Sequence, residues 1–378
     1  MATEIARGLE GVYVTETKLC RIDGQIGELV YSGYDINDLA EHSTFEEVAF
    51  LLWNQRLPSK AELEELNQKL ISERFLDDIV ERLLRELWSV VRPMRTLEIA
   101  VEALGAIDPK SSDLSHPQLK QTAARLTAKM ATVLAAYHRL RTGQTIVAPR
   151  NDLNHAANFL YMLQGTEPSP LAARVFDVAL ILHAEHEMNA STFSAMVTAS
   201  TLSDMYSAIA SAIGTLKGPL HGGANEAVYK TIEAIGPEEN IAPYIDAMTA
   251  RGERVMGIGH RIYKTTDPRA KILEKLGHEV AEESPDRRYF DMSQKMRDYL
   301  AKKLEGRPLY PNVDFFSASV YKMLGIPSDL YTPIFALARI TGWTAHLLEQ
   351  YADNRLVRPN ALYEGASNRK YEPLAKRG

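Results

Sequence analysis

The chain has 378 residues, of which 45% are hydrophobic and 24% charged, enough for a large core and for two domains. Its formal net charge of −6 and its isoelectric point of about 6.0 argue against general nucleic-acid binding, which needs a basic face to displace counterions from phosphates. Cys20 is the single cysteine, so the chain can form neither an intramolecular disulfide nor a cysteine-based metal site.

The N-terminal segment lacks the apolar core of a signal peptide, and no window approaches about 18 uninterrupted apolar residues. We therefore expect a soluble, cytoplasmic protein.

Residues 19–31 alternate between apolar and polar side chains and contain the turn dipeptide Asp23-Gly24. This pattern predicts a short β-hairpin.

Most of the remaining chain has helical periodicity, which predicts a mainly α fold. Capping-box spacing at Ser43–Glu46 and at Ser59–Glu62 indicates two helix starts. A helix over 77–91 is expected to stop before Pro93, and one over 118–142 to end at Gly143. Further helices are expected over 151–164, 170–187, 191–200, 203–217, 222–235, 241–252, 268–282, 288–304, 314–324, 328–335 and 337–352.

Small side chains gather on the expected helix over 203–217 and would let another helix pack very close to it. They are Ser207, Ala208, Ala210, Ser211, Ala212 and Gly214. We interpret this stripe as packing within the chain, with a subunit interface as the alternative.

A histidine stands on a Gly/Pro-flanked corner between two expected helices, in the segment Leu216-Lys-Gly-Pro-Leu-His221-Gly-Gly. Glycines on either side allow close approach of backbone and ligand. A neutral imidazole can donate a hydrogen bond to a substrate oxygen and exchange protons near neutral pH. The alternative is a histidine that ends a helix and satisfies a loop carbonyl.

A second informative stretch begins Gly257-Ile-Gly-His260 and is locally basic in an acidic chain. Residues 257–271 contain four basic side chains and one acid, a concentration that suggests an anionic ligand. Asp267 and Pro268 form an N-cap and first-turn pair, which places Arg269 in the opening turn of a helix. The stretch lacks the third glycine and the βαβ pattern of a dinucleotide-binding loop. His260 is therefore predicted to face a ligand rather than merely to cap a turn.

Two other polar side chains stand where a packing role would be unusual. Asp314 begins an expected helix, where it serves either as a cap or, if desolvated, as a general base. Arg339 lies in an apolar helical run, so its guanidinium needs an anionic partner, either a ligand carboxylate or an internal acid.

His183 and His186 would share a face of the expected helix over 170–187 and so resemble half of a metal site. The spacing is not that of a zinc-protease helix, and no third ligand is suggested nearby. We expect no metal site.

Taken together, these stretches resemble the citrate synthase family over nearly the whole chain. The matching segments are Gly8-Leu9, Ile22-Asp23-Gly24 with Tyr31 and Gly33-Tyr34, Glu185-His186, Lys217–Gly223, Gly257–Arg269, Asn312–Asp314, Arg339 with Gly342-Trp343, and Arg358-Pro359 with Tyr363 and Gly365. The length resembles the short, homodimeric form of the family. The resemblance implies a two-domain helical fold: a large domain of residues 1–218 and 326–378, and a small domain of 219–325 that closes over the active-site cleft.

The same resemblance implies roles for three residues in the condensation of acetyl-CoA with oxaloacetate. Asp314 is similar to the base that removes a proton from the acetyl methyl group. His221 is similar to the group that hydrogen-bonds the thioester oxygen, and His260 to the group that polarises and protonates the oxaloacetate carbonyl. The resulting citryl-CoA is then hydrolysed to citrate and CoA.

Binding residues are implied in the same way. His186, Arg269 and Arg339 match oxaloacetate-binding positions, and Arg358 matches an arginine supplied by the neighbouring subunit of a homodimer. The residues implied in CoA binding are Val255, Gly257, Gly259, Arg261 and Lys264. Acetyl-CoA is expected as a co-substrate, with no tightly bound cofactor and no nucleic-acid or membrane partner.

The sequence leaves two other functions open. A 2-methylcitrate synthase would use propionyl-CoA with the same catalytic groups, because one methylene changes discrimination by only about 1–3 kcal/mol. A non-catalytic helical binding protein would be expected to have lost one of His221, His260 or Asp314, and all three are present. Ala318 departs from the glycine that the family commonly has after this segment, which could shift Asp314 slightly.

Overall fold

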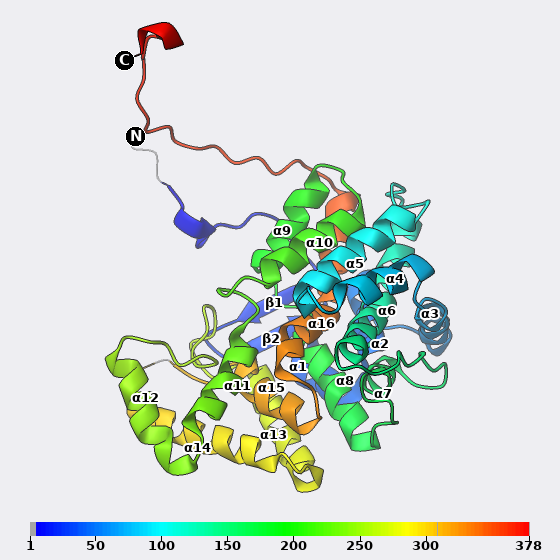
Figure 1. Cartoon of the computed structure of the whole chain (residues 1–378), viewed down its shortest axis with the longest axis vertical. Helices are drawn as coiled ribbons and strands as arrows, with labels where there is room; N and C mark the ends of the chain where they lie inside the picture. The colour runs from blue at the N-terminus through cyan, green and yellow to red at the C-terminus, as the bar shows by residue number, and fades with distance from the viewer. Residues whose placement is uncertain (1–4, 308, 378) are drawn as a thin grey trace.

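The computed structural model describes residues 5–307 and 309–377, and within them it has sixteen α-helices and one small β-sheet (Figure 1). The first helices are α1 (Ile36–His42), α2 (Phe45–Asn54), α3 (Lys60–Ser72), α4 (Asp78–Leu87), α5 (Pro93–Ile107), α6 (His116–Arg141), α7 (His155–Gln164) and α8 (Pro170–Ala184). The others are α9 (Ala190–Ser200), α10 (Met205–Leu216), α11 (Ala224–Ile235), α12 (Ile241–Ala250), α13 (Pro268–Glu283), α14 (Arg287–Lys303), α15 (Val313–Met323) and α16 (Tyr331–Ala352). The prediction of a mainly α fold is confirmed.

The predicted hairpin is present as β1 (Cys20–Asp23) and β2 (Glu28–Tyr31), paired antiparallel with Cys20 opposite Tyr31. A two-residue strand β3 (Tyr34–Asp35), which was not predicted, extends the sheet on the β2 side. At the hairpin turn, a Cβ on Gly24 would lie 2.3 Å from the carbonyl oxygen of Ile262. Glycine at this position therefore allows the turn to pack directly against the segment that follows His260.

The long helix α16 forms the centre of the core. Its residues from Tyr331 to Leu348 are all buried, because it packs against α2, α6, α8, α9 and α10 on different sides. A helix that is covered all round tolerates few ionisable residues, so the buried Arg339 and His346 within it are exceptional. This helix supplies a rigid floor for the site described below.

A second group of helices packs around α15. It comprises α11, α13 and α14, with α12 against α14, and it contacts the rest of the chain through α8 and α16 among others. In Figure 1 these helices lie together below the large helical body. The segments that carry His221, His260 and Asp314 all belong to this part of the chain or border it.

Several helix boundaries differ from those predicted. The capping box at Ser59 is confirmed, but the cap of α2 is Thr44 and not Ser43, whose hydroxyl instead donates to Glu47 at 2.6 Å. A proline is compatible with the first turn of a helix, so Pro93 starts α5 rather than only ending the helix before it. The helices expected over 328–335 and 337–352 are one continuous helix, α16, preceded by a short 3-10 turn at Ser328–Leu330.

The small residues of α10 pack within the chain, as interpreted from the sequence. The helix lies against α9, α5 and α16, and Ala208 and Ala212 have no exposed surface. Across the α9 contact, the hydroxyls of Ser194 and Ser211 lie 2.5 Å apart.

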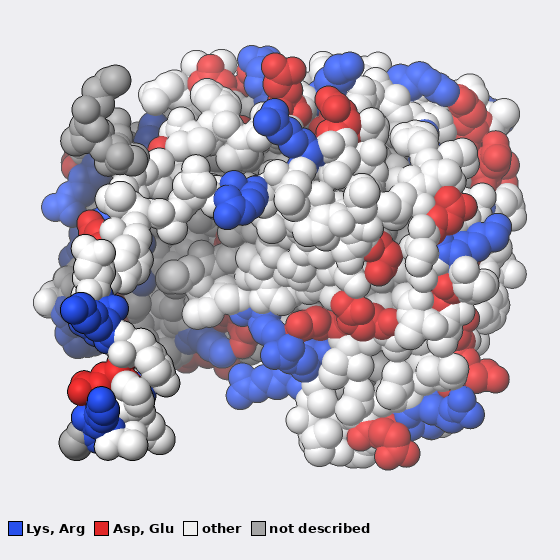
Figure 2. Space-filling model, turned by 90° about the horizontal axis from the view of Figure 1, so that it is seen from above, with Lys and Arg blue, Asp and Glu red and all other residues white. Residues whose placement is uncertain are grey.

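Within its described residues, the chain has no helix both long and apolar enough to cross a membrane. Charges of both signs are interspersed over the face seen in Figure 2.

Candidate active site

His221 lies in the corner between α10 and α11, as predicted. Its Nε2 accepts a hydrogen bond from the backbone N–H of Ser191 (3.2 Å) and lies 2.8 Å from the Ser191 hydroxyl. A ring nitrogen that accepts from a backbone N–H carries no proton, so the proton of the neutral ring is on Nδ1. Burial lowers the pKa of His221 to about 4, and the charge of Arg339 adds to this. The ring is therefore a neutral hydrogen-bond donor at neutral pH.

The corner needs glycine after the histidine. A Cβ on Gly222 would lie 2.5 Å from the carbonyl oxygen of Leu216, a distance that no real Cβ contact shows. The chain can thus turn back on the last residue of α10 only with glycine here, which fixes the direction in which His221 leaves the backbone.

His260 has the opposite tautomer. Its Nδ1 accepts from the backbone N–H groups of Ile262 (3.1 Å) and Tyr263 (3.3 Å), which leaves the proton on Nε2. Burial lowers the pKa of His260 to about 4, with a further contribution from Arg269. The ring packs edge-on against His186, with 5.2 Å between the two centroids.

His186 lies just beyond α8 and not on it. Helix α8 ends at Ala184 because Glu185 is extended (φ −143°, ψ 149°), so the expected helical face shared by His183 and His186 does not exist. His186 Nε2 is 3.3 Å from the hydroxyl of Tyr263. Burial holds the pKa of His186 well below its usual value, and Arg269 adds to this effect.

Asp314 is the second residue of α15 but does not cap it. The cap is Asn312, whose side chain accepts from the backbone N–H of Asp314 at 3.0 Å. Asp314 Oδ1 is buried and, among the described residues, has no hydrogen-bond partner. Burial raises the pKa of Asp314 to about 6, although Arg269 opposes the increase. An unpaired carboxylate of this kind is suited to accept a proton near neutral pH.

The two buried arginines differ in their partners. Arg269 is 3% exposed and donates through Nε and a terminal nitrogen to both oxygens of Asp267, at 3.0 and 2.7 Å. Arg339 is 1% exposed and donates through Nε to the carbonyl oxygen of His183 at 2.8 Å. No carboxylate of the described residues lies within 4 Å of Arg339. Its charge therefore has no ion-pair partner within the described part of the chain.

The charges of these two arginines bring the candidate residues into one electrostatic environment. Arg339 lowers the pKa of His221 and Arg269 that of His260, while both arginines act on the pKa of His186 and of Asp314. The groups singled out from distant parts of the sequence thus each feel the charge of one or both of these arginines, which together form a cationic centre.

The loop from Gly257 to Gly259 is bound to the start of α15. Asn312 donates its backbone N–H to the Gly257 carbonyl and its side-chain N–H to the Gly259 carbonyl, both at 2.9 Å. Both glycines have positive φ, 77° and 84°. Val255 is partly buried next to this loop. Any ligand held by the loop would therefore be positioned relative to Asp314.

Three predicted binding residues lie outside this cluster. Arg261 and Lys264 are exposed, and Arg261 is 3.8 Å from Glu10. Arg358 is exposed in the segment after α16, which extends away from the helical body in Figure 1. The structure does not place the side chain of Arg358 beside the other candidate residues of its own chain.

Sequence reasoning missed Ser191 and Tyr263, and it saw Asp267 only as a helix cap. Ser191 orients His221 and also accepts a hydrogen bond from Trp343 Nε1 at 3.1 Å. Asn189 caps α9 by accepting from the backbone N–H of Thr192, a local interaction that gives no hint of the contact between Ser191 and His221. Among the described residues, no group of three or more His, Cys, Asp or Glu side chains is arranged to hold a metal ion.

Comparison with known proteins identifies the family. The family model described as "Citrate synthase, C-terminal domain" matches residues 8–360. The citrate synthase of Haloferax volcanii is 49% identical over all of both chains. The 2-methylcitrate synthase of Shewanella oneidensis is 40% identical, covering 98% of this chain and 97% of its own.

The fold agrees with these relatives. The structure of the Thermoplasma acidophilum citrate synthase, a ternary complex with carboxymethyl coenzyme A and oxaloacetate, matches with a TM-score of 0.94 and 34% identity, over 99% of this chain and all of that one. Five curated relatives named citrate synthase are 43 to 49% identical to the chain, and three named 2-methylcitrate synthase are 38 to 40% identical. Citrate synthases of known structure are 34 to 42% identical to it. The chain belongs to the citrate synthase family of acyltransferase enzymes.

Proposed function

We propose that this protein condenses acetyl-CoA with oxaloacetate and hydrolyses the citryl-CoA formed to citrate and CoA. The observation that carries the proposal is that an unpartnered carboxylate, Asp314, and two neutral histidines of opposite tautomer, His221 and His260, all feel the charge of Arg269 or Arg339. Proton abstraction next to a thioester requires both a base and a donor for the developing oxyanion.

In the first step, Asp314 removes a proton from the acetyl methyl group. The electron pair moves into the new carbon–carbon double bond as negative charge develops on the thioester oxygen. His221 donates its Nδ1–H to that oxygen and so stabilises the enol or enolate. A neutral donor avoids placing an imidazolium near the charge of Arg339.

In the second step, the enol carbon attacks the keto carbon of oxaloacetate. The keto oxygen gains negative charge and receives a proton from Nε2 of His260, giving the hydroxyl of citryl-CoA. His260 then regains a proton from solvent and Asp314 releases to solvent the proton that it took from the methyl group, so both return to their starting states. Water adds to the thioester carbonyl, its hydroxyl stays on the carbonyl carbon as the new carboxyl group, the carbon–sulfur bond breaks, and CoA leaves as the thiol with the remaining proton of the water.

Oxaloacetate would be held by the groups around the cationic centre. Arg339 is free to pair with a substrate carboxylate, since no protein carboxylate neutralises it within the described residues. Arg269 and His186 would complete the binding site on the side of Tyr263. A planar guanidinium suits a carboxylate because it donates two parallel hydrogen bonds.

We further propose that Arg358 of one subunit of a homodimer completes the site of the other. Its position in the extended C-terminal segment supports this arrangement.

The proposed large domain comprises residues 1–218 and 326–378, and the proposed small domain, 219–325, would exclude water by closing over the cleft. For CoA, we propose contacts with the Gly257–Gly259 loop, Val255, Arg261 and Lys264. We expect a cytoplasmic enzyme with no tightly bound cofactor.

The nearest competing function is that of a 2-methylcitrate synthase, which the more distant relatives represent. The test is to measure kcat/KM for acetyl-CoA and for propionyl-CoA, each with oxaloacetate. The release of the free thiol of CoA reports the rate. We expect a preference for acetyl-CoA of about tenfold or more, the scale that one methylene can produce. A preference for propionyl-CoA would reverse the assignment of substrate. No thiol release with either would favour a non-catalytic binding protein.

A further inference from the structure

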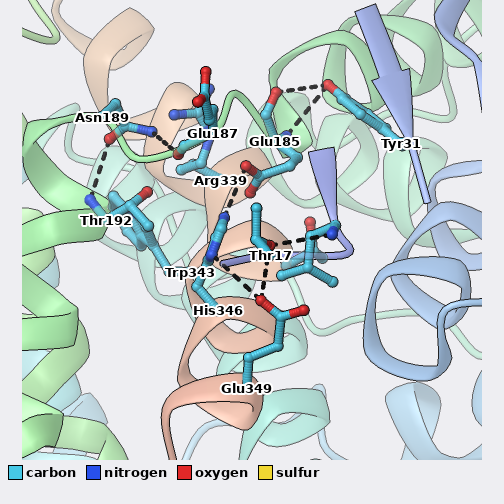
Figure 3. A network of polar contacts seen from close by, with 12 residues as sticks. Thr17, Tyr31, Glu185, Glu187, Asn189, Thr192, Arg339, Trp343, His346 and Glu349 are labelled. Carbon is cyan, nitrogen blue, oxygen red and sulfur yellow. Dashed lines mark hydrogen bonds and ion pairs between the residues drawn. The ribbon is translucent and has the colours of Figure 1, made fainter. Parts of the chain in front are cut away.

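His346 is a buried histidine placed between two carboxylates (Figure 3). It projects from α16 with Nε2 3.0 Å from Glu185 Oε1 and Nδ1 3.9 Å from Glu349 Oε2. The side chains of Glu185 and His346 are 0% and 3% exposed. A carboxylate buried this completely is costly unless a positive charge compensates it, and His346 is its ion-pair partner.

The surrounding charges favour the protonated ring. Burial lowers the pKa of His346, but attraction by Glu185, the hydrogen bond to it, and Glu349 outweigh burial and raise the pKa above its usual value, against repulsion by Arg339. Glu187, in the loop after α8, is a further acid that interacts with the ring. These four side chains are the charged groups that act on His346 from α16 itself and from the loop packed against it.

Glu185 directly precedes His186, and contacts with other parts of the chain fix both its backbone and one of its carboxylate oxygens. The Tyr31 hydroxyl donates to the Glu185 carbonyl at 2.8 Å and accepts from its backbone N–H at 3.3 Å. A Cβ on Gly342 would lie 2.2 Å from Glu185 Oε2, so the carboxylate rests directly on the backbone of α16. Tyr31 and the Glu185 carboxylate thus anchor the stretch of backbone from which His186 projects.

The two carboxylates depend on His346 to different extents. Glu349 also accepts from the Thr17 hydroxyl at 2.7 Å and from the backbone N–H of Lys18 at 3.0 Å, and it is 22% exposed. Glu185 Oε1 is bound to His346, while Oε2 is buried with no hydrogen-bond partner among the described residues. Loss of the imidazolium charge would thus affect Glu185 far more than Glu349.

We propose that His346 is a positioning residue for oxaloacetate binding: as an imidazolium it fixes the Glu185 carboxylate and thereby holds His186 toward the substrate. This inference rests on the function proposed above and deepens it. Because the folded-state pKa of His346 is raised, the ion pair is complete below the ordinary histidine value of about 6.5 and is lost as pH rises through the raised value. Oxaloacetate affinity therefore falls with rising pH.

The test is His346→Gln, which keeps a hydrogen-bond donor near Glu185 but removes the charge. We expect the KM and the calorimetric Kd for oxaloacetate to rise about tenfold while kcat changes by less than about threefold, because binding is altered more than chemistry. The rise of Kd that we expect for the wild type from about pH 6 to about pH 9 should be absent in the variant.

Two matched variants sharpen the result. Glu349→Gln, which removes the charge of the outer carboxylate, should leave Kd at about pH 6 near wild type and move its rise to lower pH, because Glu349 helps to raise the pKa of His346. The double variant Glu185→Gln/His346→Gln restores a neutral hydrogen-bonded pair, so most of the lost affinity should return without pH dependence.

A wild-type Kd for oxaloacetate that does not rise with pH would overturn the proposal, and this measurement needs no variant to fold. A folded His346→Gln protein with wild-type Kd would also overturn it, as would equal losses in oxaloacetate and acetyl-CoA affinity. Calorimetry does not depend on turnover, so failure here is distinguishable from a wild type that releases no thiol and thereby contradicts the proposed function.

Discussion

His221 and His260 both have lowered pKa values, but they are opposite tautomers. Backbone N–H groups determine which ring nitrogen of each carries the proton. The N–H of Ser191 points at Nε2 of His221, whereas the N–H groups of Ile262 and Tyr263 point at Nδ1 of His260. Burial lowers the pKa of each ring to about 4. Both are therefore neutral donors at neutral pH, which suits them to stabilise charge that develops only during the reaction.

At the same scale, Asp314 should impose an acidic limit on activity. Burial raises its pKa to about 6, so kcat/KM should fall as pH decreases through that value, because the protonated acid cannot accept a proton. Asp314→Asn should lower kcat by about a thousandfold or more and change the Kd for oxaloacetate by less than about threefold. Steady-state kinetics across pH and calorimetry of the variant test this. Near-normal turnover in Asp314→Asn would rule out its role as the base.

The same carboxylate should reduce stability. Its folded-state pKa is above the unfolded value, so its contribution is most favourable at acid pH and is lost as pH rises through about 6. Asp314→Asn should therefore raise the free energy of unfolding at neutral pH, by up to about 3 kcal/mol at about 1.4 kcal/mol per pKa unit. Denaturant unfolding near pH 4 and near pH 8 provides the comparison. A gain of equal size at both pH values would contradict this origin.

At the scale of elements, Asp267 joins the starts of two helices. Its carboxylate accepts from the backbone N–H of Arg269 at the start of α13 and from that of Val313 at the start of α15, and it also pairs with the Arg269 side chain. The proposed base on α15 and the buried arginine on α13 are thereby fixed relative to one another. The sequence indicated only the cap, because Val313 is 46 residues away along the chain.

Packing of α16 against the end of α8 also requires one glycine. A Cβ at Gly342 would lie 2.2 Å from Glu185 Oε2 and 2.3 Å from the carbonyl oxygen of Ala184. Gly342→Ala should therefore destabilise the protein by about 2 kcal/mol or more and raise the KM for oxaloacetate, although alanine normally favours a helix. Thermal unfolding and steady-state kinetics measure the two effects.

Gly214→Ala in α10 is the matched control, since a Cβ there meets only the flexible end of Glu98 at 3.3 Å. It should be neutral or mildly stabilising within the subunit. If both variants have wild-type stability and KM, the close contact at Gly342 is not a constraint on the site.

The position of His186 depends on where α8 ends. Periodicity predicted a helix through residue 187, but the extended conformation of Glu185 ends α8 earlier and turns His186 toward Tyr263. The reason is tertiary, since Glu185 is bound to Tyr31 and His346, both distant in sequence. By contrast, the Asp267-Pro268 start of α13 was predicted correctly, because capping is a local interaction.

At the scale of the whole molecule, the C-terminal segment leaves the helical body with Arg358 exposed (Figure 1). If Arg358 acts across a dimer, mixing two inactive variants should restore activity. In a heterodimer of Arg358→Ala and Asp314→Asn subunits, one site has Asp314 from the first and Arg358 from the second. Statistical mixing should then give about a quarter of wild-type activity, measured after subunit exchange.

An arginine acting within its own subunit gives the opposite result. Each site of the heterodimer would then lack one group, and activity would stay at the level of the separate variants. Sedimentation of the wild type provides the control, since a monomer of full activity would exclude any role across subunits.

Sequence alone determined the helical class, the hairpin and most helix starts, because caps, periodicity and glycine corners are local signals. The sequence marked His221, His260 and Asp314 as separate candidates, and a family resemblance related them. Only the tertiary structure decided the tautomers of the two histidines, the raised pKa of Asp314 and the lack of an ion-pair partner for Arg339 among the described residues. Those properties arise from burial and from contacts between segments far apart in the chain, which no local pattern encodes.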